Sequence, residues 1–177
     1  LLEVVEAYNG KDFVDSARAL NRAVNLQIVE IINEELQFCH DKLQSACYDT
    51  LDEEKKVLLH RVIGETYLTR GDPESTYKAA LHLNECPSLT ESNDATAMAK
   101  VNLEAAKYCQ SRAAFGDAAC LLQSGLEQLN RDTSSKWNEN FHLTLETLYG
   151  LAGVQLGIGD YDGCEQTLKE SLLHCDS

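Results

Sequence analysis

The side chains best able to do chemistry in this sequence lie in three adjacent pairs, Cys39-His40, His40-Asp41 and His174-Cys175. A histidine beside a carboxylate can transfer protons, and a cysteine beside a histidine can bind zinc. Adjacent residues at a helix start point to different sides, however, and neither Cys/His pair has a second pair at zinc-ligand spacing. We therefore expect no catalytic residue and no metal ligand, and we expect Asp41 to cap a helix.

The other histidines and the known nucleotide-binding motifs lead to the same expectation. His60, His82 and His142 lie at the edges of apolar helix faces, where they are expected to make structural contacts. The sequence has no Gly-x-x-x-x-Gly-Lys-Ser/Thr loop, no His-Arg-Asp or Asp-Phe-Gly kinase signature, no Gly-x-Ser-x-Gly elbow and no His-Glu-x-x-His helix. We expect no cofactor site in this segment, and no enzyme activity.

The composition indicates a folded, acidic protein. Hydrophobic residues make up 44% and charged residues 25% of the 177 positions, and the formal charge is −14. A surface with this much negative charge repels nucleic acid and anionic lipid. The expected partners are therefore proteins or neighbouring domains of the same chain. No apolar run approaches the ~18 residues of a membrane span. Because the chain starts at Leu1 without Met, we expect it to be part of a longer protein.

The cysteines indicate a reducing compartment. There are seven, an odd number, and in the helical stretches they occupy positions typical of small apolar residues. Reduced, buried thiols are expected in the cytosol or the nucleus, and we expect a cytoplasmic location.

A β-hairpin is predicted near the start of the chain. Residues 26–32 are rich in β-branched side chains, residues 33–35 form a polar turn, and residues 36–38 resume the alternation of apolar and polar positions. Phe38, at the strand end, is expected to be buried between the hairpin and the next helix. His40 is expected to pack against the hairpin.

The rest of the chain is predicted to be helical. Asp52 or Thr50 can cap one helix, Gly71 can end it, and Pro73 can begin the next. The predicted helices cover 13–24, the segment after Asp41 to about 51, about 52–70, 73–86, 95–110, 114–129, 137–156 and 160–175, with polar linkers at 88–94 and 130–135.

A degenerate repeat runs through the second half. The segment Gly159-Asp160-Tyr161-x-x-Cys164 resembles the turn of tetratricopeptide repeats, and Ala113-Ala114-Phe115-x-x-Ala118 matches it more loosely. Tyr161 and Phe115 lie 46 residues apart instead of the usual 34, and neither unit has the closing proline. We expect an α-solenoid in which Tyr161 packs between its two helices, near a small Ala152.

Trp137 and Phe141 are the candidate protein-interaction residues. Because they are four residues apart, they are expected to share one helix face, which Leu145 and Leu148 continue. The pair either covers the preceding helices or offers a partner an aromatic anchor.

The order helix, helix, hairpin is that of a winged-helix unit whose first part is missing, which raises DNA binding as a possibility. A recognition helix needs basic residues that face the groove. Lys11, Arg18 and Arg22 are instead spread over the helix before the hairpin, with Asp12 and Asp15 among them. A structural or docking role is therefore expected.

The motif Phe38-x-His40-Asp41-Lys42-x-Gln44-x-Ala46-x-Tyr48, followed by Leu59-His60-x-x-Ile63-Gly64, resembles one family in order and spacing. That family is the large multidomain kinases, including hybrid serine/threonine–histidine kinases, in which an AAA-type ATPase with a winged-helix end precedes tetratricopeptide-like helices. Cys39 and Cys47 depart from it, since the family more often has Val and Ala there. The resemblance implies the C-terminal part of a winged-helix-like subdomain, with the β-hairpin, at 1–50 and a tetratricopeptide-like helical repeat region at 51–177.

The resemblance also implies a function. This segment would be a non-catalytic scaffold that couples an upstream ATPase module to downstream output, with ATP bound elsewhere in a parent protein kinase. Two alternatives stay open: a free-standing tetratricopeptide-type adaptor for a peptide or protein, and a winged-helix transcription factor with a helical tail.

Overall fold

The computed structural model describes residues 13–32, 35–86, 92–131 and 133–175. The chain is mainly helical, with a small two-stranded antiparallel sheet near its start. In chain order the elements are α2 (Phe13–Asn25), β1 (Val29–Ile32), β2 (Glu35–Phe38), α3 (Asp41–Asp49), α4 (Glu53–Leu68), α5 (Pro73–Leu83), α6 (Ser92–Ser111), α7 (Phe115–Asn130), α8 (Thr133–Asn138), α9 (Phe141–Ile158) and α10 (Tyr161–Cys175).

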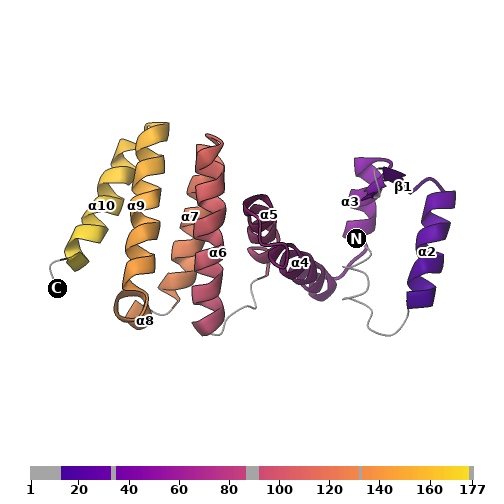
Figure 1. Cartoon of the computed structure of the whole chain (residues 1–177), viewed down its shortest axis with the longest axis horizontal. Helices are drawn as coiled ribbons and strands as arrows, with labels where there is room; N and C mark the ends of the chain where they lie inside the picture. Colours follow the sequence, from indigo (N-terminus) through magenta and orange to yellow (C-terminus); the bar gives the residue numbers. More distant parts are fainter. Residues whose placement is uncertain (1–12, 33–34, 87–91, 132, 176–177) are drawn as a thin grey trace.

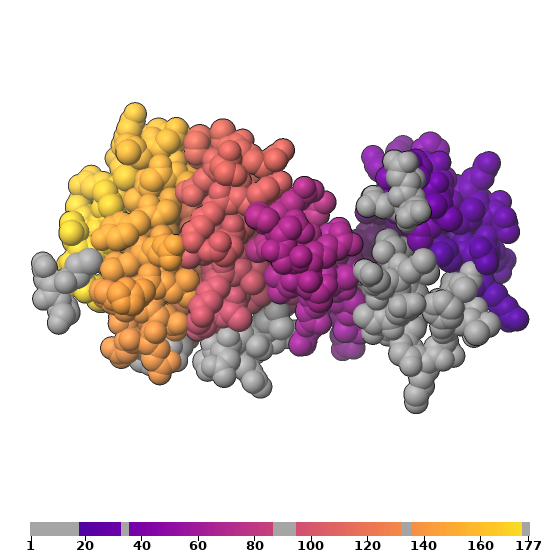
Figure 2. Space-filling view, in the orientation of Figure 1, coloured from indigo at the N-terminus to yellow at the C-terminus, as the bar shows by residue number. Residues whose placement is uncertain are grey.

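The helices from α4 onward lie in a row that follows the chain (Figure 1). Helix α4 packs on α5, α5 on α6, α6 on α7, α7 on α9, and α9 on α10. The hairpin, α2 and α3 form a unit at one end of the row, and α10 lies at the other end (Figures 1 and 2).

The predicted hairpin is confirmed: β1 pairs with β2 in the register Val29 to Phe38 and Ile32 to Glu35. Phe38, however, is 37% exposed, so the prediction that it is buried was wrong. Its helical neighbour α3 has no buried residue, so α3 offers little cover for a large ring. His40 is exposed as well, and is the N-cap residue of α3.

Several helix ends follow from capping chemistry. The side chain of Asp52 accepts a hydrogen bond from the Lys55 amide, and that of Asp72 accepts one from the Ser75 amide, while Pro73 occupies the first turn of α5. The Asp41 cap was predicted wrongly, because α3 has no side-chain cap and Asp41 lies within its first turn. There its charge suits the positive end of the helix dipole.

Positive φ angles mark three of the predicted breaks. Gly159, at φ 81°, ends α9, and the Asp160 carboxylate accepts a hydrogen bond from the Gly163 amide at 3.1 Å. Ala113, at φ 58°, separates α6 from α7 in a left-handed conformation that is uncommon for a non-glycine residue. Gly71, at φ 71°, lies in the turn after α4, two residues beyond the C-cap residue Thr69.

The core runs along the row instead of gathering in one place. It joins α5, α6, α7 and α9 through small and branched apolar side chains: Ala80, Leu103, Ala105, Ala106, Cys109, Ala118, Leu121, Leu122, Leu151 and Val154. The alanines let α6 and α7 approach closely, so the two helices interlock over most of their length.

One buried polar pair stabilises the junction between α5 and α6. Asn84 and Asn102 exchange two side-chain hydrogen bonds of 2.8 and 3.0 Å, and Asn102 also donates to the Met98 carbonyl. Asn102 is fully buried, and these bonds compensate for the loss of its water contacts.

The repeat positions agree with the sequence pattern only in part. Ala106, Ala118, Ala152 and Cys164 are buried as the repeat predicts. Tyr161, in contrast, is 69% exposed, so the prediction that it packs between its two helices was wrong. It is the first residue of α10, and there its ring faces solvent instead of Ala152.

The cysteine prediction also holds only in part. Of the cysteines whose side chains the structure describes, Cys86, Cys109 and Cys164 are buried, Cys39 is half-buried, and Cys47 and Cys120 are exposed; all are free thiols.

Candidate protein-interaction site

Trp137 and Phe141 do not share a helix, which corrects the prediction of one long helix over 137–156. Trp137 lies in the short helix α8, and Phe141 begins α9. Asn138 ends α8 and Asn140 is the N-cap residue of α9, where its side chain makes no cap hydrogen bond. Thr144 closes the turn, since its hydroxyl donates to the Lys136 carbonyl at 2.9 Å.

The Trp137 ring nevertheless meets Phe141, and it also meets a residue that the sequence did not connect with it. The ring centroids of Trp137 and His174 are 3.8 Å apart with the planes 15° from parallel, and those of Trp137 and Phe141 are 6.3 Å apart. Trp137 therefore holds the last turn of α10. Both candidate residues are half-buried, so each leaves part of its ring accessible to a partner.

Lys136 is the residue of this site that sequence analysis missed. It is only 4% exposed, and its ammonium donates to Asn130 Oδ1 at 2.7 Å and to Glu170 Oε1 at 2.6 Å. The same ammonium lies 5.0 Å from the centre of the Trp137 ring. One cation thus joins α7, α8 and α10. In the sequence it looks like an ordinary linker lysine beside serines, and the only hint is the tryptophan that follows.

The burial of Lys136 leads to a prediction about Glu170. Glu170→Gln should lower the free energy of unfolding by roughly 1.5–3 kcal/mol, because it removes the carboxylate that faces a buried ammonium. Lys136→Met should cost less, since it removes the buried charge and keeps an apolar chain of similar length. Urea denaturation of both variants measures the difference.

The exposed pair Glu165 and Lys169, also on α10, provides the control. Glu165→Gln should change stability by less than about 0.5 kcal/mol, because exposed ion pairs contribute little. Equal losses for Glu170→Gln and Glu165→Gln would contradict the role given to Lys136.

A second cluster lies where α3 meets α4 and α5. The Tyr48 hydroxyl is 2.9 Å from His60 Nε2, and His60 Nδ1 is 3.1 Å from His82 Nδ1. The Tyr67 ring stacks on His82 with centroids 6.2 Å apart. Burial first, and then the neighbouring His60, lower the pKa of His82, so the neutral form is favoured. The structural contacts predicted for His60 and His82 are confirmed.

His142 differs from these two histidines. It is exposed on α9, and its ring meets Phe141 edge-on at 5.7 Å.

Within the described residues, no group of three or more His, Cys, Asp or Glu could hold a metal ion. Burial raises the pKa of the Cys86 and Cys109 thiols, which makes both poor nucleophiles.

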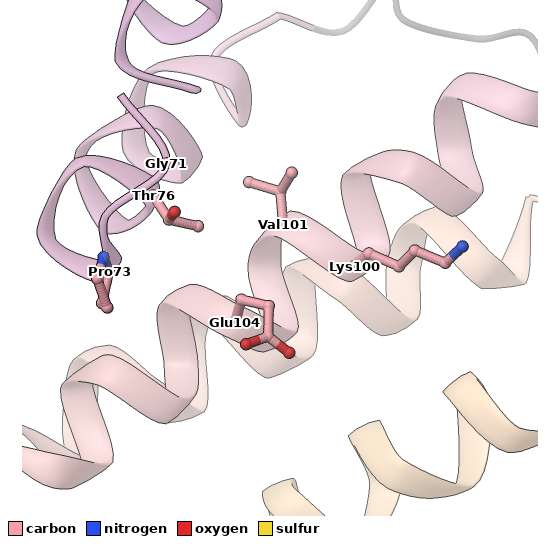
Figure 3. A pocket seen from close by; sticks show the side chains of 6 residues that line it. All are labelled: Gly71, Pro73, Thr76, Lys100, Val101 and Glu104. Atoms are coloured by element: carbon pink, nitrogen blue, oxygen red, sulfur yellow. The ribbon is translucent and has the colours of Figure 1, made fainter. Parts of the chain in front are cut away.

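A shallow groove lies between the start of α5 and the middle of α6 (Figure 3). Its lining residues are Gly71, Pro73, Thr76, Lys100, Val101 and Glu104. The Lys100 ammonium points away from α5 in Figure 3, so it adds no charge between the two helices. The lining contains no histidine or cysteine, and we assign no chemistry to it.

Comparison of the chain with models of known protein families gave no match, and neither did comparison with curated proteins or with solved structures. The resemblance to the multidomain kinases, and the domain boundary near residue 50 that it implies, therefore remain predictions. Among the helices of the part that the structure describes, none is both long and apolar enough to cross a membrane.

Proposed function

We propose that this chain is a non-catalytic helical scaffold within a larger, cytoplasmic ATP-binding protein kinase. In this proposal its helix pairs form a tetratricopeptide-like α-solenoid that couples an upstream ATPase module to downstream output. Its partners are neighbouring domains or other proteins. The observation that carries the proposal is the continuous core, in which buried side chains of α5, α6, α7 and α9 touch along the row. A close-packed interior transmits displacement because it has few voids to absorb it.

The solenoid part of the proposal is supported by the order of packing. Each helix from α4 to α7 contacts mainly its neighbours in the chain, and the short α8 only inserts between α7 and α9. The buried small residues Ala106 and Ala152 lie 46 residues apart, as do Ala118 and Cys164. Such spacing is expected when successive helix pairs repeat one arrangement.

The coupling part is supported by the cluster at the first joint of the row. Tyr48 belongs to the N-terminal unit, and its hydroxyl meets His60 of α4, which in turn meets His82 of α5. Lys56 of α4 also lies 5.1 Å from the centre of the Tyr48 ring. A movement of the N-terminal unit would therefore act on α4 and α5 through directional contacts.

The proposal is tested by separating this segment from its parent. The isolated chain should show no saturable ATP binding in calorimetry at micromolar to millimolar ATP, because it has no phosphate-binding loop. The full-length protein should bind and hydrolyse ATP through a P-loop in the region preceding Leu1. Saturable binding by the isolated chain, or a parent sequence without any nucleotide-binding motif, would contradict the proposal.

A second candidate, a tetratricopeptide-type adaptor for a peptide or protein, is favoured by one observation. Helix α10 exposes Leu168 and Leu172 to solvent at the end of the row. Exposed apolar surface of this kind often marks an interaction site. An adaptor would bind its partner without nucleotide, whereas coupling requires the partner's binding or output to depend on ATP in the full-length protein.

A further inference from the structure

Helix α9 packs on the surface of the α6–α7 pair, and this contact shows what kind of helix such a surface binds. Gly150 of α9 lies against both helices of that pair. Gln110 of α6 donates to the Gly150 carbonyl at 3.5 Å, and a Cβ atom on Gly150 would lie 3.3 Å from Cδ2 of Leu122 in α7. The surface thus accepts an apolar helix that has a very small residue at the point of closest approach.

The same positions recur one unit later, where no element that the structure describes covers them. Leu156 stands 46 residues after Gln110, and Leu168 stands 46 residues after Leu122. Leu122 is buried beneath α9, whereas Leu168 is 40% exposed and Leu156 is exposed as well. The surface of the α9–α10 pair that corresponds to the α9-binding surface of the α6–α7 pair is therefore exposed to solvent.

Two more residues of α10 extend this surface. Leu172 stands 46 residues after Leu126, which packs against the core; Leu172 is 62% exposed. Tyr161, Leu168 and Leu172 are spaced at i, i+7 and i+11, so they lie on one side of the helix. We call Leu156, Tyr161, Leu168 and Leu172 the terminal face; it belongs to the end of the row opposite the N-terminal unit (Figure 2).

The charges beside the terminal face are mostly negative. Asp160, Asp162 and Glu165 occupy the turn and the first part of α10, and the nearby Lys169 pairs with Glu165. The whole chain has a formal charge of −14, which opposes the approach of a second copy. A partner with basic residues would be attracted instead.

We propose that the terminal face binds an amphipathic α-helix of a partner protein, an apolar helix with a glycine or alanine facing Leu168 and with basic residues along its flanks. This inference rests on the proposed scaffold function and names the chemistry of its partner. The helix would occupy the place on α9 and α10 that α9 occupies on α6 and α7.

The probe is a synthetic peptide with the length of α9, 18 residues. It keeps the residues with which α9 meets the preceding pair, namely Leu143, Gly150, Leu151 and Val154, and has lysine and alanine elsewhere. Labelled at one end, it should bind the whole chain saturably in fluorescence anisotropy, with a Kd below about 100 μM. Replacing its glycine with leucine, or its lysines with glutamate, should weaken binding by about tenfold or more.

Variants of the protein locate the site. Leu168→Glu and Leu172→Glu should each weaken peptide binding by about tenfold or more, because each places a charge in the apolar contact. Leu173→Glu is the matched control, since Leu173 is 75% exposed on another side of α10 and should leave the affinity unchanged. Circular dichroism melts should be unaltered in all three, because each residue is exposed in the native chain.

Three results would overturn the inference: no saturable binding, equal effects of Leu168→Glu and Leu173→Glu, or a dimer in sedimentation that Leu168→Glu dissociates. The last would show that a second copy covers the face. None of these results bears on ATP binding by the full-length protein, so failure here is distinguishable from failure of the scaffold proposal.

Discussion

Leu122→Ala is expected to lower the free energy of unfolding by about 2–5 kcal/mol, because it opens a cavity between α7 and its neighbours. The Leu122 side chain is almost fully buried in the core cluster and lies against Gly150 of α9. Removing the Leu122 side chain therefore weakens both the contact between α6 and α7 and the contact between α7 and α9. Urea denaturation followed by circular dichroism measures it.

The control is another leucine-to-alanine change, at a position without cover. Leu173→Ala should change stability by no more than about 0.5 kcal/mol, since its side chain is already in solvent. If Leu122→Ala also cost less than about 1 kcal/mol, α7 and α9 could not pack as described.

Gly64→Ala is expected to lower the free energy of unfolding by a net amount of about 1–2 kcal/mol. A Cβ atom on Gly64 would lie 2.5 Å from Cγ and 2.7 Å from Cδ2 of Leu83, so α4 and α5 would have to separate. Overpacking of this kind costs typically about 1–3 kcal/mol, and the better helix propensity of alanine offsets up to about 1 kcal/mol of it.

Gly153→Ala is the same substitution at another glycine, and it is expected to change the free energy of unfolding in the opposite direction. Gly153 lies within α9 and is exposed, and nothing would approach its added Cβ within 4 Å. This substitution should stabilise the chain by roughly 0.5–1 kcal/mol. Thermal melts of the two variants should move in opposite directions; a stabilising Gly64→Ala would show that α4 and α5 do not meet at this glycine.

Local signals in the sequence predicted the secondary structure well. The β-branched residues before the turn at 33–35 predicted the hairpin, and Asp52 and Asp160 each accept the backbone hydrogen bond expected of a cap or turn residue. These features depend on a few neighbouring residues, so a single sequence is enough to predict them.

Contacts between distant segments were predicted less well. Phe38 and Tyr161 were expected to be buried because they are large and apolar, but burial depends on which element comes to cover them. Lys136 is the converse case, since its partner Glu170 lies 34 residues away, and nothing near Lys136 in the sequence indicates that pairing.

The order in which the helices touch determines how stability is distributed. Since each helix is held mainly by the ones before and after it, the free energy of folding resembles a sum over adjacent contacts along one dimension. Among the helices that the structure describes, α6 and α7 have neighbours on both sides, whereas α10 and the N-terminal unit each have a described neighbour on one side. In the isolated chain, opening is therefore expected to begin at the N-terminal unit and at α10, and a partner that covers either of them lengthens the cooperative unit by one more contact.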